Sequence, residues 1–426
     1  MPSAVSHGYE EIAKEIKAIF SVTESTLHSL KKELIKDKFS TSYAFISKNI
    51  EYVVSFIYSE LDKIISKNQN ICDTWVSSPL MMSQIKGNPS IIFEYRDSIR
   101  EFGDATRTIV SNLYANVGKT LAYYILVYET LEKFGLKPPF VLVESTEFSN
   151  HHLVDFIFGE FDKIAPAEPY KLTNAQVITY SGIDVYDPLS ILIIGHEAFH
   201  IIERLNGLFN SFCNTTDFKG DMRCRDVFVD ILSTFYFGPV YVYSMYKHFE
   251  KRYPISGESH MEMNIRLLGL IYLISVLGIA KISEEQIKEM IAFTKTLENR
   301  MDSEDRKNAQ ADKKKFEEMI DKGVIKYVEN YFKDKNITPY SQFVNVIEKR
   351  EINQSPDKIN RDKIKIMIRK EIPVAVRPTT LLNTLYESKQ IDQVETSLII
   401  ASFKKWYVKR YYEKSVEKTM AEKSIY

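Results

Sequence analysis

The chain has 426 residues, of which 44% are hydrophobic, enough to bury the core of one large domain or of two to three smaller ones. Its 56 lysines and arginines are balanced by 57 aspartates and glutamates, so no net field concentrates nucleic acid or anionic lipid. A dedicated nucleic-acid-binding protein is therefore disfavoured. The three cysteines are too few and too unevenly placed for a disulfide framework or a cysteine-based zinc site.

The sequence shows no membrane or secretion feature. The opening segment, residues 1–16, lacks the basic start followed by an apolar run that a secretory signal has. The longest apolar stretch, residues 267–280, is shorter than the roughly 20 residues that a transmembrane helix requires. We expect a soluble, cytoplasmic protein with no membrane partner, and the sequence leaves the oligomeric state open.

The first predicted element is a helical region over residues 9–134, where apolar residues recur at three- and four-residue intervals. Lys137-Pro138-Pro139 interrupts this pattern. Residues 140–143 and 175–180 are rich in β-branched and aromatic residues and are predicted strands. We expect them to form a small sheet next to the helix that follows.

Three apolar helices are predicted in the middle of the chain, each ended by a glycine, a proline or a change to charged sequence. They cover residues 189–208, which follow Asp187-Pro188 and contain Gly207 near the end, residues 225–237, ended by Gly238-Pro239, and residues 265–280. Residues 302–315 are almost devoid of large apolar side chains, which indicates a solvated loop or an exposed helix. Charged amphipathic helices are predicted to follow, with boundaries at Pro339, Pro356, Pro373 and Pro378.

The sequence His196-Glu197-Ala198-Phe199-His200 is an HExxH motif inside the first of these helices. A separation of four residues places both imidazoles on one helix face, about one turn apart, where they can bind one metal ion. Glu197 can then act as the general base on a metal-bound water, whose pKa zinc lowers to roughly 7. The alternative is a pair of core histidines without a metal. The apolar residues before the motif make that costly, because they bury the polar cluster.

A catalytic zinc ion has three protein ligands and one open position. The extended metzincin motif is absent, since Glu203 and Asn206 stand where it has Gly and His. The helix over residues 225–237 offers Asp226 as a third ligand and Asp230, on the same face, as the hydrogen-bond acceptor of a liganding histidine. The alternative for Asp226 and Asp230 is an ordinary pair of surface carboxylates.

This arrangement resembles the gluzincin group of zinc metallopeptidases, in which HExxH is followed on a second helix by a Glu-x-x-x-Asp element. It is especially similar to uncharacterised intracellular gluzincin-like proteins with a Pro-Leu segment before the motif helix and a Gly-Pro-x-Tyr segment after the second helix, here Pro188-Leu189 and Gly238-Pro239-Val240-Tyr241. The resemblance implies zinc bound by His196, His200 and Asp226, Glu197 as base, and Asp230 in the second shell. The chain departs from the pattern by having Asp instead of Glu at 226, which requires the second helix to lie closer to the metal.

Peptide hydrolysis also needs a donor that stabilises the oxyanion of the tetrahedral intermediate. His260 and Arg266 are the predicted catalytic donors, because they lie before and at the start of the third apolar helix. Tyr236, Tyr241 and Tyr243 are further candidates, each with packing as the alternative role.

We therefore expect an α+β, predominantly α-helical fold with a zincin-like catalytic centre, a small β-sheet and large helical flanking regions. The predicted domains are an N-terminal helical region (1–136), the catalytic core (137–281) and a charged helical C-terminal region (282–426). The expected function is a metallopeptidase with one Zn²⁺ per chain that cleaves a peptide or protein substrate. The alternatives are a non-catalytic or regulatory protein-binding module on the same scaffold, and a di-iron protein, which would need a second histidine motif.

Overall fold

The computed structural model describes the central part of the chain. The described segments are residues 117–145, 148–152, 175–181, 190–251, 261–277 and 284–337, with isolated helical residues between 14 and 104. The chain divides into two compact units, one made of residues 1–120 and 138–180 and the other of residues 121–137 and 181–426. The predicted domain bounds at residues 136 and 281 stay predictions, because compactness does not show which segments fold independently.

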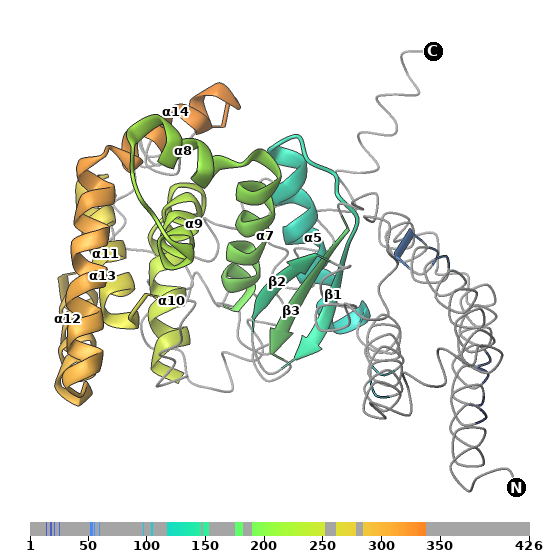
Figure 1. Cartoon of the computed structure of the whole chain (residues 1–426), viewed down its shortest axis with the longest axis horizontal. Helices are drawn as coiled ribbons and strands as arrows, with labels where there is room; N and C mark the ends of the chain where they lie inside the picture. Colours follow the sequence, from blue (N-terminus) through green and yellow to red (C-terminus); the bar gives the residue numbers. More distant parts are fainter. Residues whose placement is uncertain are drawn as a thin grey trace, which may run out of the picture. The chain divides into compact units, whose positions relative to one another are not determined.

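The described part is mainly helical with a small sheet, as the α+β prediction requires (Figure 1). The helices are α5 (Val117–Lys133), α7 (Ser190–Asn206), α8 (Leu208–Thr216), α9 (Met222–Phe237), α10 (Pro239–Lys251), α11 (Met263–Val276), α12 (Glu284–Arg300), α13 (Ser303–Asp321) and α14 (Val324–Asp334). None of these described helices is long and apolar enough to cross a membrane.

The sheet contains β1 (Phe140–Ser145), β2 (Ser149–His152) and β3 (Gln176–Ser181) in the order β1-β3-β2. Strands β1 and β3 confirm the two predicted strands, and β3 is buried along its whole length. Strand β2 pairs antiparallel with β3 and was not predicted, because its sequence Ser-Asn-His-His has little intrinsic β preference. Pairing with a buried neighbour, supported by a 2.7 Å hydrogen bond between the Ser149 and Thr179 hydroxyls, determines its conformation.

The three predicted apolar helices are α7, α9 and α11. Helix α7 ends before Gly207, which has the left-handed φ of 59° and confirms the predicted end. Helix α9 starts at Met222, earlier than predicted, because the Asp221 side chain accepts a hydrogen bond from the Cys224 backbone N–H and caps the helix. Gly238, with a φ of 77°, ends it. Helix α11 covers the predicted third helix as far as the structure describes it.

Helices α7, α9 and α10 pack against one another, and α11 packs against α9 and α10 on one side and α12 and α13 on the other. Helix α7 is buried over much of its length, since residues 192–199 are all buried. A functional group on α7 therefore lies in the interior of the helical unit, and α9 is the helix that faces it most extensively.

Gly195, directly before the motif, allows the close approach of α7 to the end of α9. A Cβ atom at this position would lie 2.5 Å from the Phe237 ring. Phe237 is fully buried and is in edge contact with the rings of Phe199 and Tyr236, so it has no room to move. A glycine inside a helix costs about 1 kcal/mol relative to alanine, and here that cost permits the packing that positions His196.

We therefore expect Gly195→Ala to lower the free energy of unfolding by about 1–3 kcal/mol, although the higher helix propensity of alanine alone would raise it. Gly269→Ala in α11 is the matched control. Its Cβ would lie 2.8 Å from the ring of Phe316, which is half-buried and can rotate outward, so its effect should stay within about 0.5 kcal/mol. Chemical denaturation of both variants measures this difference. Equal effects of the two substitutions would show that the Phe237 contact is not what requires glycine.

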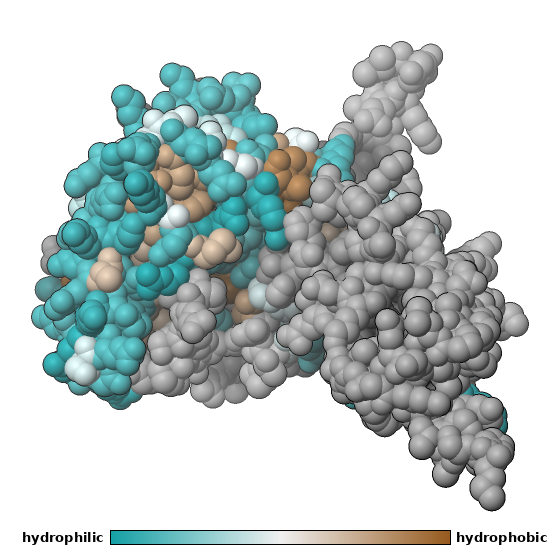
Figure 2. Space-filling model, viewed as in Figure 1, coloured by the Kyte–Doolittle hydropathy of each residue, from teal (hydrophilic) through white to brown (hydrophobic). Residues whose placement is uncertain are grey.

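The charged segment 302–315 is part of a helix. Asp302 caps α13 by accepting hydrogen bonds from the backbone N–H groups of Glu304 and Asp305, and the Asp305 side chain bonds back to the Asp302 N–H. This capping box decides between the loop and the exposed helix that the composition left open. The surface over α12 and α13 is predominantly hydrophilic (Figure 2). The predicted boundaries at Pro339, Pro356, Pro373 and Pro378 lie outside the described residues.

Candidate metal centre

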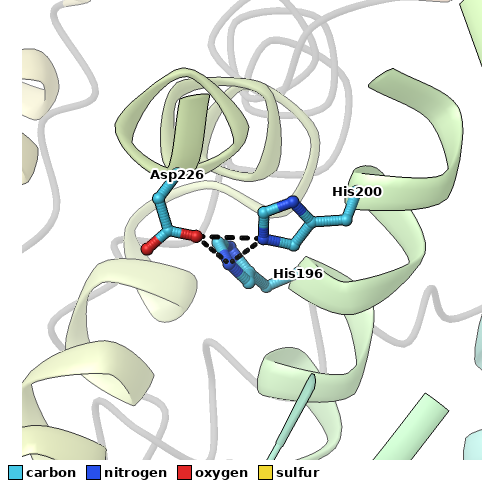
Figure 3. Close-up of side chains that lie close together, drawn as sticks. All are labelled: His196, His200 and Asp226. Atoms are coloured by element: carbon cyan, nitrogen blue, oxygen red, sulfur yellow. Dashed lines mark hydrogen bonds and ion pairs between the residues drawn. The ribbon is translucent and has the colours of Figure 1, made fainter. Parts of the chain in front are cut away.

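Helix α7 brings the two histidines of the motif together. The Nε2 atoms of His196 and His200 are 3.0 Å apart, and the two rings are nearly perpendicular. Figure 3 shows both rings directed from consecutive turns of α7 toward the same point. The His196 side chain is 6% exposed and that of His200 is 22% exposed, so the pair is open to solvent on the His200 side. Both nitrogens are therefore available to one ion.

Asp226 reaches the same point from α9. Its Oδ1 atom lies 3.0 Å from Nε2 of His200 and 3.7 Å from Nε2 of His196 (Figure 3). The residue is 5% exposed. The interpretation of Asp226 and Asp230 as surface carboxylates is therefore wrong, because α9 packs its acidic face against α7. This close packing also lets the short aspartate side chain reach a position where glutamate was expected.

The three ligand atoms fit a single metal ion. They lie within 4.8 Å of one another, and their separations of 3.0, 3.0 and 3.7 Å can be compared with an ideal site. In a tetrahedral zinc site with bonds near 2.0–2.1 Å, neighbouring ligand atoms are about 3.3 Å apart. The buried group of His196, His200 and Asp226 can thus hold a metal ion, and no other His, Cys, Asp or Glu among the described residues joins these three.

Asp230 and Tyr241 determine the orientation of His196. The Tyr241 hydroxyl donates a 2.6 Å hydrogen bond to Oδ1 of Asp230 and lies 2.8 Å from Nδ1 of His196. Nδ1 is also 3.2 Å from Asp230 Oδ1. Since the tyrosine proton points to Asp230, Nδ1 of His196 carries the proton that it shares with these oxygens. When this imidazole is neutral, as a metal ligand has to be, its lone pair is on Nε2, the atom directed at the other two ligand atoms.

Arg266, from α11, connects the two carboxylates. Its Nε and Nη2 atoms donate hydrogen bonds of 2.8 and 3.0 Å to the two oxygens of Asp230. Its Nη1 atom lies 2.6 Å from Oδ2 of Asp226. Arg266 is buried, and its guanidinium packs against the Phe249 ring. One cation thus compensates part of the charge of two buried carboxylates, which would otherwise be costly to bury.

The electrostatic surroundings favour positive charge between the histidines and the carboxylates. Burial by itself lowers the pKa of His196, but hydrogen bonds to Asp226 and Asp230 outweigh burial and raise the pKa from 6.5 to about 10. Burial alone would raise the pKa of Asp230, but the nearby Arg266 guanidinium and His196 lower it. His196 therefore shares with Arg266 the task of balancing these carboxylates, and a metal ion bound at Nε2 would replace the His196 proton and supply positive charge at the same place.

Glu197 is the remaining motif residue. It is 6% exposed, yet it makes no hydrogen bond or ion pair with any residue that the structure describes. Glu203, also on α7 and 1% exposed, differs in this respect, because it pairs with Arg225 at 3.1 Å and accepts a hydrogen bond from the Phe209 N–H. Within the described part of the chain, Glu197 is thus the carboxylate beside the histidines that is left without such a contact.

The predicted oxyanion donors lie in different places in the structure. His260 lies outside the described residues. Arg266 is at the site, but its contacts with both carboxylates do not support its predicted role as a donor to the substrate. Tyr241, named only as one candidate donor, is instead buried behind His196, where burial and Asp230 raise the pKa of its hydroxyl well above 10. The Gly238-Pro239 sequence after α9 is the local signal that could have predicted the position of Tyr241.

Comparisons with protein-family models, with curated proteins and with solved structures found no match to this chain. Over the described residues, His196, His200 and Asp226 form the one group of three or more potential metal ligands.

Proposed function

We propose that the chain is a zinc-dependent hydrolase, and specifically a metallopeptidase of the gluzincin type that acts on a peptide or protein substrate in the cytoplasm. The observation that carries this proposal is the convergence of His196 Nε2, His200 Nε2 and Asp226 Oδ1 beside the buried carboxylate of Glu197, which makes no hydrogen bond or ion pair with the described residues. Two imidazoles and one carboxylate form a ligand set typical of catalytic zinc, which keeps a fourth position for water or substrate, whereas a structural zinc site has four protein ligands.

Zinc held by these ligands would act as a Lewis acid that polarises a carbonyl group and lowers the pKa of water to roughly 7. Glu197 is one residue from His196 on α7 and is the group that would accept a proton from that water and pass it to the leaving amine. Asp230 and Tyr241 keep the Nδ1 proton of His196 in place, so that Nε2 remains a ligand throughout. The exposed side of His200 is the side from which a substrate would approach.

Metal analysis of the full chain tests the first part of the proposal. We expect about one equivalent of zinc in the purified wild-type protein and its loss in His196→Ala, because removal of one of three ligands weakens binding strongly. His248→Ala is the matched control, since this histidine lies on α10 outside the ligand group and should leave the zinc content unchanged. Equal zinc content in His196→Ala and the wild type, or no zinc uptake by either, would contradict the assignment.

A cleavage assay tests the second part and separates an enzyme from a non-catalytic binding protein. The zinc-loaded chain is incubated with an unbiased peptide library, and products are identified by mass spectrometry. We expect cleavage that stops when a chelator removes the metal and returns when zinc is added. Zinc binding without any cleavage would favour the alternative of a regulatory protein-binding module.

A further inference from the structure

We propose that Arg266 is a positioning residue that reserves one oxygen of Asp226 for the metal ion and so keeps the fourth coordination position open. The inference rests on the metal site of the proposed function and adds a residue that controls its coordination number. It assigns Arg266 a role different from the oxyanion donor expected from its position in the sequence.

The two oxygens of Asp226 face different groups. Oδ1 lies 3.0 Å from Nε2 of His200, at the point where the ligand atoms converge. Oδ2 lies 2.6 Å from Nη1 of Arg266. A carboxylate bound through both oxygens would fill two positions around a metal ion. Because Arg266 holds Oδ2 in a charge-assisted hydrogen bond, only Oδ1 is available, and the carboxylate binds through one oxygen.

The orientation of Arg266 is itself fixed. Its Nε and Nη2 atoms make a two-pronged contact with the oxygens of Asp230, one turn after Asp226 on α9. The Phe249 ring lies 5.5 Å from the guanidinium carbon, and the side chain is 8% exposed. The planar guanidinium is therefore clamped by Asp230 and presents its last nitrogen to Asp226.

The same geometry explains why this position requires arginine. The two carboxylates stand four residues apart on one face of α9, and the guanidinium contacts both with three different nitrogens. A lysine has a single ammonium nitrogen and cannot reproduce a bidentate contact to Asp230 together with the bond to Asp226. A positive charge alone is therefore insufficient to hold Asp226 and Asp230 together, and Arg266→Lys should lose the positioning role.

The experiment uses the full chain loaded with cobalt(II), whose visible absorption is stronger in four-coordinate than in five- or six-coordinate sites. We expect strong bands in the wild-type protein. In Arg266→Lys and Arg266→Gln, Asp226 can bind through both oxygens, and the absorption per bound cobalt should fall severalfold. Arg225→Gln is the matched control, because Arg225 neighbours Asp226 in sequence but pairs with Glu203, and its spectrum should match that of the wild type.

A double variant tests the same expectation in case the single Arg266 variants do not fold. Arg266→Gln combined with Asp230→Asn removes one cation and one anion together, which avoids leaving Asp230 buried without its counter-ion. It frees Oδ2 of Asp226 in the same way, so its cobalt spectrum should also weaken. Thermal unfolding of each loaded variant establishes that the spectra come from folded protein.

The outcomes separate the inference from the proposed function. If the wild type binds cobalt with strong bands and the folded Arg266 variants give the same spectrum, the positioning role is overturned while the metal site stands. If the wild type binds no cobalt, both the metal site and the role of Arg266 are overturned. A weakened spectrum in the Arg266 variants and an unchanged one in Arg225→Gln support the inference.

Discussion

Glu197→Gln is expected to lower the rate of peptide hydrolysis by about 10²- to 10⁴-fold while the protein keeps its zinc. Glutamine has nearly the same size as glutamate but cannot accept a proton at neutral pH. Glu197 is not one of the three converging ligands, so its replacement should leave the affinity for zinc almost unchanged. Steady-state rates on a library-derived peptide, measured beside the zinc content, test both statements.

Glu203→Gln is the matched control for this prediction. Glu203 lies on the same helix and is also buried, but it is bonded to Arg225 and to the Phe209 N–H. Its replacement should lower the free energy of unfolding, by about 1–3 kcal/mol, because Arg225 loses its ion pair. The rate of the folded enzyme should stay close to that of the wild type. Equal activity losses in both variants would argue that the carboxylates act through stability and that Glu197 is not the base.

Asp226→Ala and Asp230→Ala are expected to separate metal binding from stability, although the two carboxylates lie one turn apart and share Arg266. Asp226→Ala removes a ligand, and the protein should lose its zinc on dialysis. Its stability should fall less, because Arg266 keeps both bonds to Asp230. Asp230→Ala leaves the three ligands present and should weaken zinc binding by about 10- to 100-fold, since His196 loses the acceptor that orients it.

The stability effects should be in the reverse order. Asp230 is 1% exposed and accepts from Tyr241, from Arg266 and from His196. Its removal leaves these buried groups without their shared acceptor, which typically costs about 3–5 kcal/mol. Chemical denaturation of the metal-free proteins measures this term without a contribution from zinc. If Asp226→Ala proves the more destabilising variant, Asp230 is not the structural centre of the network.

Much of the helical framework could be predicted from local sequence. The apolar runs, together with Gly207 and Gly238, determine where α7 and α9 end, because both glycines have a positive φ that does not continue the helix. The strand β2 could not be predicted, since Asn150 and His151 have no strand preference of their own and depend on β3 as a partner. Residues 302–315 were predicted only as loop or helix, and the capping contacts of Asp302 decided between them.

The sequence by itself determined the pairing of His196 with His200, because a separation of four residues on a helix places both rings on one face whatever surrounds them. It likewise determined that Asp226 and Asp230 share a face of α9. Only the tertiary structure decided that this face turns toward the histidines, that Asp226 is close enough to join them, and that Arg266 and Tyr241 complete the network. These contacts join α7, α9, α10 and α11, whose mutual packing depends on side-chain fit between distant segments and on the close approach at Gly195, which no local pattern encodes.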